Sequence, residues 1–262
     1  MKVIAVVSAK GGVGKTTLAA NLASVLGSNG RRVIVVDFDP QNALRLHFGI
    51  PVDHFDGVAR ATVAGDPWRS VMFDGIDGVT VLPHGALNED DRRSFEARLD
   101  SHPDLVRTSL DALGLEPSDI VLIDTPPGAT VYTRAALLAA RYVLNVVIAD
   151  AASYAAIPQM ERLLQAYALP RADFLGYGYV INQVDVGRNL TKDVLKVLRG
   201  TLEPNLFPGV VHLDQGVSES LAYDTTVIHY DPLSQAAADL RACGDWLDAR
   251  LNGGAAQPRS AA

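Results

Sequence analysis

The chain has 262 residues, 48% of them hydrophobic, and a formal net charge of -7 from 23 Lys and Arg against 30 Asp and Glu. This content is ample for a sizeable core, and the acidic balance excludes a general electrostatic attraction to nucleic acid or anionic lipid. The single cysteine, Cys243, excludes an internal disulfide and an iron–sulfur cluster held by several thiolates of one chain.

Apolar, β-branched runs alternate along the chain with helix-like segments. The first run, KVIAVVS, has the continuous hydrophobic pattern of a strand buried on both faces, and the helix pattern after it closes at Gly30. The predicted strands span 2–8, 31–40, 78–85, 119–128, 141–150, 174–183 and 205–213, and the predicted helices span 16–30, 105–113, 130–140, 155–168 and 189–203. This alternation predicts an α/β fold, a doubly wound, mostly parallel sheet with helices on both faces.

Two stretches interrupt the alternation, 50–76 and 88–100, and have the character of insertions or short surface helices. We predict one domain over 1–250 and a disordered Gly/Pro/Ala-rich tail over 251–262, which lacks the periodicity of a membrane anchor. No apolar run approaches the ~18 residues of a transmembrane helix, so we expect a cytosolic protein.

The stretch SAKGGVGKTT, residues 8–17, ends as a phosphate-binding loop between a strand and a helix. Glycines in such a loop let backbone N–H groups surround a triphosphate without a Cβ in the way. We expect ATP and Mg²⁺ as ligands, with Lys15 on the β and γ phosphates, the Thr16 hydroxyl on Mg²⁺ and Thr17 near the α phosphate. The remaining loop residues predicted to bind nucleotide are Gly11, Gly12, Val13 and Gly14.

A second lysine, Lys10, stands at the mouth of the loop. The pattern K-G-G-x-G-K-T-T resembles the deviant Walker motif of the MinD/ParA ATPases, the SIMIBI class of P-loop proteins. That resemblance implies that Lys10 contacts the nucleotide of a partner subunit, as an arginine finger does. It therefore implies a homodimer that forms around ATP.

Acidic residues follow two predicted strands, where ligands of open α/β sheets bind. Asp37 and Asp39 lie in VVDFDPQN, and Asp124 lies in VLIDTPPG. By resemblance, Asp39 positions the attacking water and is catalytic together with Lys10 and Lys15, and Asp124 lies near Mg²⁺, directly or through water. Asp37 has an alternative role as a cap at the strand end.

Contacts to the nucleotide base also follow from the resemblance. Asn182, in the stretch INQ, matches an adenine-binding asparagine. Leu213 and Asp214 fall where the family has a base-contacting IPRN stretch, but His212 replaces its proline.

Stretches between the motifs are similar to BcsQ, the MinD-like ATPase family of bacterial cellulose secretion. They are NALRLHFGI (42–50), GVARATVAGDPWRS (57–70), LPHG (82–85) and GDWLDARL (244–251). This likeness implies a switch in assembly or localisation of the secretion machine. The implied partners are the small protein BcsR and, through it, the membrane cellulose synthase complex. The likeness also implies recruitment to the inner face of the cell membrane.

Two other functions remain open. One is a ParA- or MinD-type partitioning or positioning ATPase acting on DNA or a membrane. The acidic balance opposes that reading, and we expect no tight DNA binding. Arg31-Arg32 and Arg92-Arg93 are the only adjacent basic pairs. The other is a small-molecule enzyme of the same fold, such as a dethiobiotin synthetase, which usually lacks the first lysine of the loop.

Overall fold

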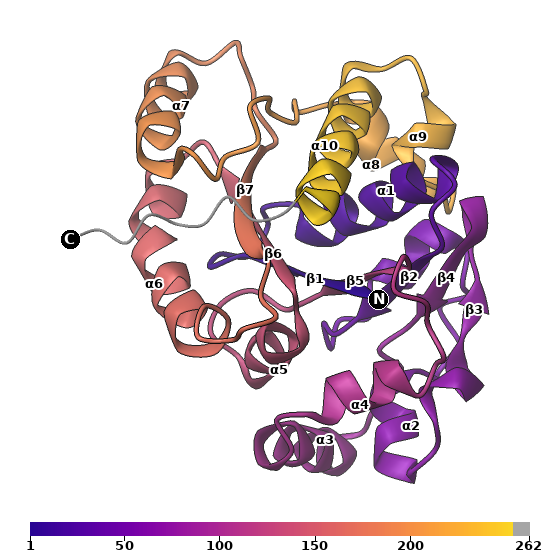
Figure 1. The fold of residues 1–262 in the computed structure, drawn as a ribbon. Helices are drawn as coiled ribbons and strands as arrows, with labels where there is room; N and C mark the ends of the chain where they lie inside the picture. Colours follow the sequence, from indigo (N-terminus) through magenta and orange to yellow (C-terminus); the bar gives the residue numbers. More distant parts are fainter. Residues whose placement is uncertain (254–262) are drawn as a thin grey trace.

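A computed structural model describes residues 1–253 and shows a seven-stranded sheet in the order β3-β4-β2-β5-β1-β6-β7 (Figure 1). All neighbouring strands are parallel except β3, which is antiparallel to β4. The strands are β1 (Lys2–Val7), β2 (Val33–Asp37), β3 (Phe73–Asp74), β4 (Val79–Leu82), β5 (Ile120–Asp124), β6 (Tyr142–Ile148) and β7 (Gly176–Asn182). The predicted α/β class with a mostly parallel sheet is confirmed.

Helices cover both faces of the sheet (Figure 1). One face packs against α1 (Lys15–Ser28), α8 (Gln215–Ala222), α9 (Val227–Tyr230), α10 (Gln235–Asn252) and the 3-10 helix η1 (Leu44–Phe48). The other packs against α2 (Val58–Ala64), α3 (Glu89–Ser101), α4 (Leu105–Asp111), α5 (Val131–Ala139), α6 (Ala151–Tyr167) and the 3-10 helix η2 (Trp68–Val71). A third core lies between α6, β7 and α7 (Asn189–Leu202).

Strand register brings the acidic residues together at one edge. Asp37 of β2 is the register partner of Asp124 of β5, and Asp124 also pairs with Val6 of β1. The carboxyl ends of these three parallel strands therefore meet where the chain leaves β1 for the glycine-rich loop. This edge is the position at which open α/β sheets bind ligands.

The predicted strand over 205–213 is wrong. This segment makes only two isolated bridges, Tyr179 with Leu206 and Val184 with His212. Pro208 has no N–H to donate, and together with Gly209 it interrupts the backbone pairing of this segment. Residues before and after these two positions still make backbone hydrogen bonds to β7, but they form no continuous strand. The sequence pattern also missed β3, which has only two residues.

The two interrupting stretches contain short elements, as predicted. Residues 50–76 hold α2, η2 and β3, and 88–100 form most of α3, whose N-cap Asn88 accepts a hydrogen bond from the Asp91 backbone N–H. At the chain end, α10 continues to Asn252, and the predicted tail lies outside the described residues from 254 onward.

The last helix packs closely on the first. A Cβ at Gly244 of α10 would lie 2.6 Å from a methyl group of Val25 in α1, so only glycine permits this approach. The neighbouring Cys243 is fully buried in the same core, and burial raises the pKa of its thiol. It is a small core residue, as the sequence suggests.

Candidate nucleotide site

The glycine-rich loop connects β1 to α1 and has the backbone that its sequence predicts. Gly12 and Gly14 have φ values of 76° and 78°, in the left-handed region that glycine adopts without strain. A Cβ at Gly14 would lie 2.6 Å from Nδ2 of Asn182, so a larger residue cannot fit there without displacing that side chain. Helix α1 begins at the next residue, and its N-terminal N–H groups face the loop, an arrangement suited to phosphate.

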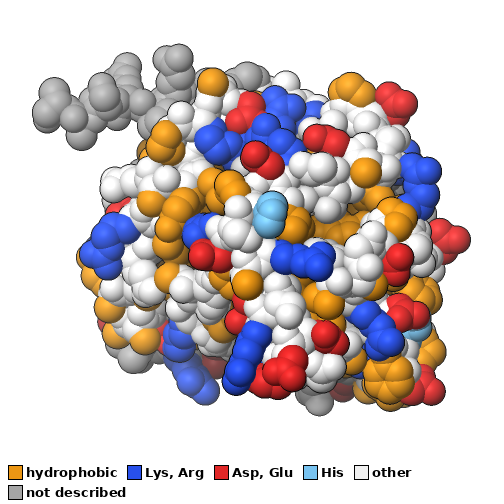
Figure 2. Space-filling view, turned by 90° about the horizontal axis from the view of Figure 1, so that it is seen from below, with side chains coloured by type: hydrophobic (Ala, Val, Ile, Leu, Met, Phe, Trp, Pro, Cys, Tyr) orange, Lys and Arg blue, Asp and Glu red, His pale blue; other side chains and the backbone are white. Residues whose placement is uncertain are grey.

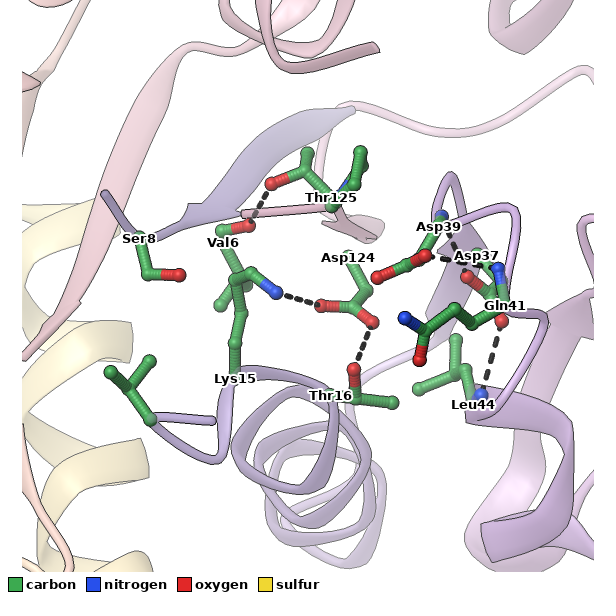
Figure 3. A network of polar contacts seen from close by, with 12 residues as sticks. Val6, Ser8, Lys15, Thr16, Asp37, Asp39, Gln41, Leu44, Asp124 and Thr125 are labelled. Carbon is green, nitrogen blue, oxygen red and sulfur yellow. Dashed lines mark hydrogen bonds and ion pairs between the residues drawn. The ribbon is translucent and has the colours of Figure 1, made fainter. Parts of the chain in front are cut away.

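Lys15, Thr16 and Asp124 converge beside the loop (Figure 3). The Thr16 hydroxyl donates to Oδ2 of Asp124 at 2.6 Å, and Nζ of Lys15 lies 3.8 Å from Oδ1. Asp124 is fully buried, and within the described part of the chain its Oδ1 has no hydrogen-bond partner. Burial raises the pKa of the Asp124 carboxyl to about 6, although Lys15 and Thr16 act in the opposite direction.

These groups fit a magnesium ion. Mg²⁺ is commonly held by one or two oxygens of the protein together with waters and substrate phosphates. A buried carboxylate oxygen without a donor, beside a threonine hydroxyl at the start of α1, is such a set. A cation here would also compensate for the burial of the Asp124 charge.

Asp37 and Asp39 belong to the same short motif but lie in different environments. Both carboxylate oxygens of Asp37 accept backbone N–H groups, from Asp39 at 2.9 Å and from Leu44 at 3.0 Å. Asp37 thus fixes the loop after β2, in agreement with the alternative that it caps the strand end. Burial, followed by the charge of Asp124, raises the pKa of Asp37 well above its usual range.

Asp39 lies beside Asp124 at the same edge of the sheet (Figure 3). Its Oδ1 accepts the Gln41 backbone N–H at 3.0 Å, and its carbonyl accepts that of Asn42. Asn42 in turn accepts the backbone N–H of His84 through its side-chain oxygen. The loop after β2 is thereby connected to the chain that follows β4. The Asp39 carboxylate lies where it could hold an attacking water.

Lys10 does not contact the Lys15–Asp124 cluster. Its Nζ lies 2.5 Å from Oδ2 of Asp150, the N-cap of α6, and both side chains are more than a third exposed. The other Asp150 oxygen accepts the Ser153 backbone N–H at 2.7 Å. Although burial alone would raise the pKa of Asp150, the hydrogen bonds from Lys10 and Ser153 hold it below its usual value.

A cavity extends from the loop to the segment that precedes α8. Its lining includes Gly14 and Thr17 together with the predicted base-contacting residues Asn182, Leu213 and Asp214. The structure therefore brings the predicted base-contacting residues to one place.

Their side chains are not equally available to a ligand. Leu213 is 60% exposed. The carboxylate of Asp214 accepts N–H groups of Gly216 and Ala236, which join α8 to α10. The sequence reasoning that selected Asp214 did not anticipate this structural use. Asn182 donates from Nδ2 to the Val13 carbonyl at 2.8 Å, which ties β7 to the loop.

The two adjacent arginine pairs of the sequence do not form a basic patch, because each of these arginines pairs with an acidic side chain. Arg31 and Arg32 pair with Asp248 and Asp119. The other adjacent pair contacts acidic residues of its own helix, α3. On the face that carries α2 and α3, acidic and basic side chains are interspersed (Figure 2).

The sequence analysis did not predict a basic stripe on α7, because the basic residues that form it are not adjacent in the sequence. Arg188, Lys192, Lys196 and Arg199 are exposed and follow the start and length of α7 at intervals of four, four and three residues. That spacing places them on one side of a helix, and it is the signal that could have revealed the stripe.

Among residues 1–253, no helix is both long and apolar enough to cross a membrane.

Comparison with known proteins agrees with this geometry. The family model described as "Cellulose biosynthesis protein BcsQ" matches residues 1–247. The chain is 27% identical to the cellulose biosynthesis protein BcsQ of Salmonella typhimurium, over 94% of each chain. It is 30% identical to the chromosome-partitioning ATPase Soj of Thermus thermophilus, over 95% of this chain and 96% of that protein.

Solved structures share the fold. The septum site-determining protein MinD of Pyrococcus horikoshii, complexed with Mg-ADP, superposes with a TM-score of 0.76 at 22% identity, covering 94% of this chain and 96% of that one.

Proposed function

The chain belongs to the BcsQ family of MinD/ParA-type ATPases, and from this premise we propose that it binds ATP·Mg²⁺ and hydrolyses it slowly as a switch in bacterial cellulose secretion. The observation that carries the proposal is the convergence of Lys15, Thr16 and Asp124 beside a left-handed glycine turn at the head of α1. Lys15 binds the β and γ phosphates, and Thr16 and Asp124 hold the metal.

Within this proposal, hydrolysis uses a water oriented by Asp39. A carboxylate near the γ phosphate aligns the attacking water and does little covalent chemistry itself, because phosphoryl transfer depends mainly on positioning and charge. The position of Asp39 beside Asp124 supports this role.

The switch is an ATP-dependent homodimer in which each subunit gives Lys10 to its partner's nucleotide. Lys10 contacts Asp150 and not the Asp124 cluster that Lys15 contacts, so it does not duplicate Lys15 within its own subunit. Two-fold symmetry then requires one lysine to be given and one received by each subunit. We propose residues 1–250 as one ATPase domain that carries out this cycle in the cytoplasm.

The proposed partners are BcsR and, through it, the cellulose synthase complex at the inner face of the membrane. The test is deletion of the gene in a cellulose-producing host, followed by complementation with wild type or Lys15→Ala. Wild type should restore cellulose, measured by dye binding, and the variant should not, although both accumulate equally on immunoblots. Normal cellulose in the deletion strain would refute the proposed role.

The basic stripe on α7 favours a second candidate function, a partitioning ATPase that binds DNA without sequence preference. Three exposed cations on α7, with Arg188 at its N-cap paired to Asp185, are a local exception to the net charge of -7. Fluorescence anisotropy with ATP and duplex DNA at two salt concentrations discriminates the two functions. Tight binding with a steep salt dependence that Lys192→Glu/Lys196→Glu removes would support partitioning, and weak binding unchanged by this variant favours the cellulose role.

A further inference from the structure

The loop between β2 and η1 carries Asp39, and Asn42 connects this loop to a distant part of the chain. Inside the loop, Asp37 accepts the Asp39 backbone N–H at 2.9 Å, and the Asp39 carbonyl accepts the Asn42 N–H at 2.8 Å. The Asn42 side chain leaves this local network, because its Oδ1 accepts the His84 backbone N–H at 3.0 Å, across 42 positions of sequence. Within residues 1–253, no other side chain of 39–43 makes a hydrogen bond outside the loop.

Asparagine suits this position for two physical reasons. Asn42 is 6% exposed and has a φ of 52°, in the left-handed region that only glycine, asparagine and aspartate adopt readily. Glycine has no side-chain acceptor for the His84 N–H. Aspartate would add a third carboxylate close to Asp37 and Asp39. Asparagine therefore supplies the required backbone and a neutral acceptor together.

The donor that Asn42 uses belongs to a firmly held turn. His84 is 2% exposed, and its Nδ1 lies 2.9 Å from the carbonyl oxygen of Gly85. Its ring packs edge-on against Phe95 of α3 and tilted against Tyr132 of α5, with centroid distances of 5.9 and 6.0 Å. Its carbonyl accepts the backbone N–H of Ala59 in α2 at 3.0 Å. The turn after β4 is thus fixed by three helices.

These contacts form a chain from the fixed turn to the carboxylate-bearing residue. The turn holds Asn42 through its side chain, and Asn42 holds Asp39 through its backbone N–H. A carboxylate that aligns an attacking water acts through geometry, so its restraint affects the rate. We propose that Asn42 is a positioning residue for ATP hydrolysis, which keeps the Asp39 carboxylate aligned with the water. This inference rests on the proposed hydrolysis through Asp39 and names the residue that holds this carboxylate in place.

The test uses Asn42→Gly, which permits the same left-handed backbone but removes the acceptor. The matched control is Asp224→Gly, since Asp224 also has a positive φ, 54°, but is an exposed residue after α8. Both changes are also made in the Asp39→Ala background. Single-turnover hydrolysis is followed at saturating ATP and at a protein concentration that gives full wild-type activity per subunit, and calorimetry measures ATP affinity.

Loss of this one hydrogen bond should lower the hydrolysis rate of Asn42→Gly by about 2- to 10-fold. ATP affinity should stay unchanged, because the bond does not involve the phosphate loop, and Asp224→Gly should behave as wild type in both assays. Adding Asn42→Gly to Asp39→Ala should cause no further loss of rate, since the carboxylate that Asn42 positions is already absent.

A wild-type rate in Asn42→Gly would overturn the inference and leave hydrolysis by this chain standing. The same follows if Asn42→Gly slows Asp39→Ala by the factor by which it slows wild type, because Asn42 would then act independently of Asp39. A wild type that hydrolyses no ATP would overturn the proposed function, and this inference with it.

Discussion

The contact between Lys10 and Asp150 predicts that Asp150→Asn strengthens ATP-dependent dimerisation. In the proposed dimer, Lys10 reaches the partner's nucleotide only after it leaves Asp150, with which it pairs in the single subunit. Asparagine removes the charge yet caps a helix as well as aspartate does, so the hydrogen bond from Ser153 at the start of α6 can persist.

The expected change in the dimer dissociation constant follows from the solvent exposure of the Lys10–Asp150 pair. The side chains of Lys10 and Asp150 are 39% and 37% exposed, so solvent screens their attraction. Pairs of this kind contribute about 0.2–1 kcal/mol. A symmetric dimer releases two of them, about 0.4–2 kcal/mol in all, so the dimer dissociation constant should fall by about 2- to 30-fold.

Analytical ultracentrifugation over a range of protein concentrations, with a slowly hydrolysed ATP analogue or with ADP, measures this constant. Wild type should dimerise with the analogue and stay monomeric with ADP. Lys10→Ala should bind nucleotide but remain monomeric in both. The double variant, Lys10→Ala/Asp150→Asn, should behave as Lys10→Ala alone, because the second change acts only by releasing the lysine.

Two results would refute this reasoning. If Asp150→Asn dimerises no more tightly than wild type, the ion pair does not restrain Lys10. If the double variant dimerises as tightly as Asp150→Asn, the gain does not involve Lys10, and its proposed action across the interface is wrong.

Three further substitutions test the site and the fold. Lys15→Ala should weaken ATP binding tenfold or more in calorimetry, because a charge-assisted hydrogen bond is worth roughly 1.5–3 kcal/mol; equal affinity would contradict the phosphate assignment. Asp39→Ala should bind ATP but hydrolyse it far more slowly in a phosphate-release assay, and a wild-type rate would make Asp39 structural only. Burial lowers the pKa of His47 from 6.5 to about 4, so the folded protein binds fewer protons than the unfolded chain between these values. The free energy of unfolding should therefore fall as pH drops through this window, by at most about 3 kcal/mol from this group. In urea titrations His47→Gln should show a smaller fall than wild type, and parallel pH profiles would contradict the argument.

The sequence predicted the sheet and the backbone of the glycine-rich loop because both depend on local patterns. Strands buried on both faces read as continuous β-branched runs, and the loop needs glycine at Gly12 and Gly14 for its left-handed backbone. The placing of Asp37 and Asp124 at one edge followed from a parallel sheet alone, since the carboxyl ends of parallel strands lie together.

Local sequence patterns gave wrong or missing predictions where the geometry of the chain outweighs its composition. The run 205–213 is rich in strand-forming residues, but Pro208 and Gly209 divide its pairing with β7. The basic stripe on α7 is a helical feature, and adjacent pairs such as Arg92-Arg93 gave no sign of it.

Only the tertiary structure decided the partners of the charged groups. Lys10 meets Asp150 across 140 positions of sequence, His212 meets Asp239 from a different element, and Asp214 is engaged by α8 and α10. The sequence shows which residues are charged. The partner of a charged side chain, its burial and therefore its pKa depend on which distant segments the fold brings within a few ångströms, and no local pattern of residues encodes that.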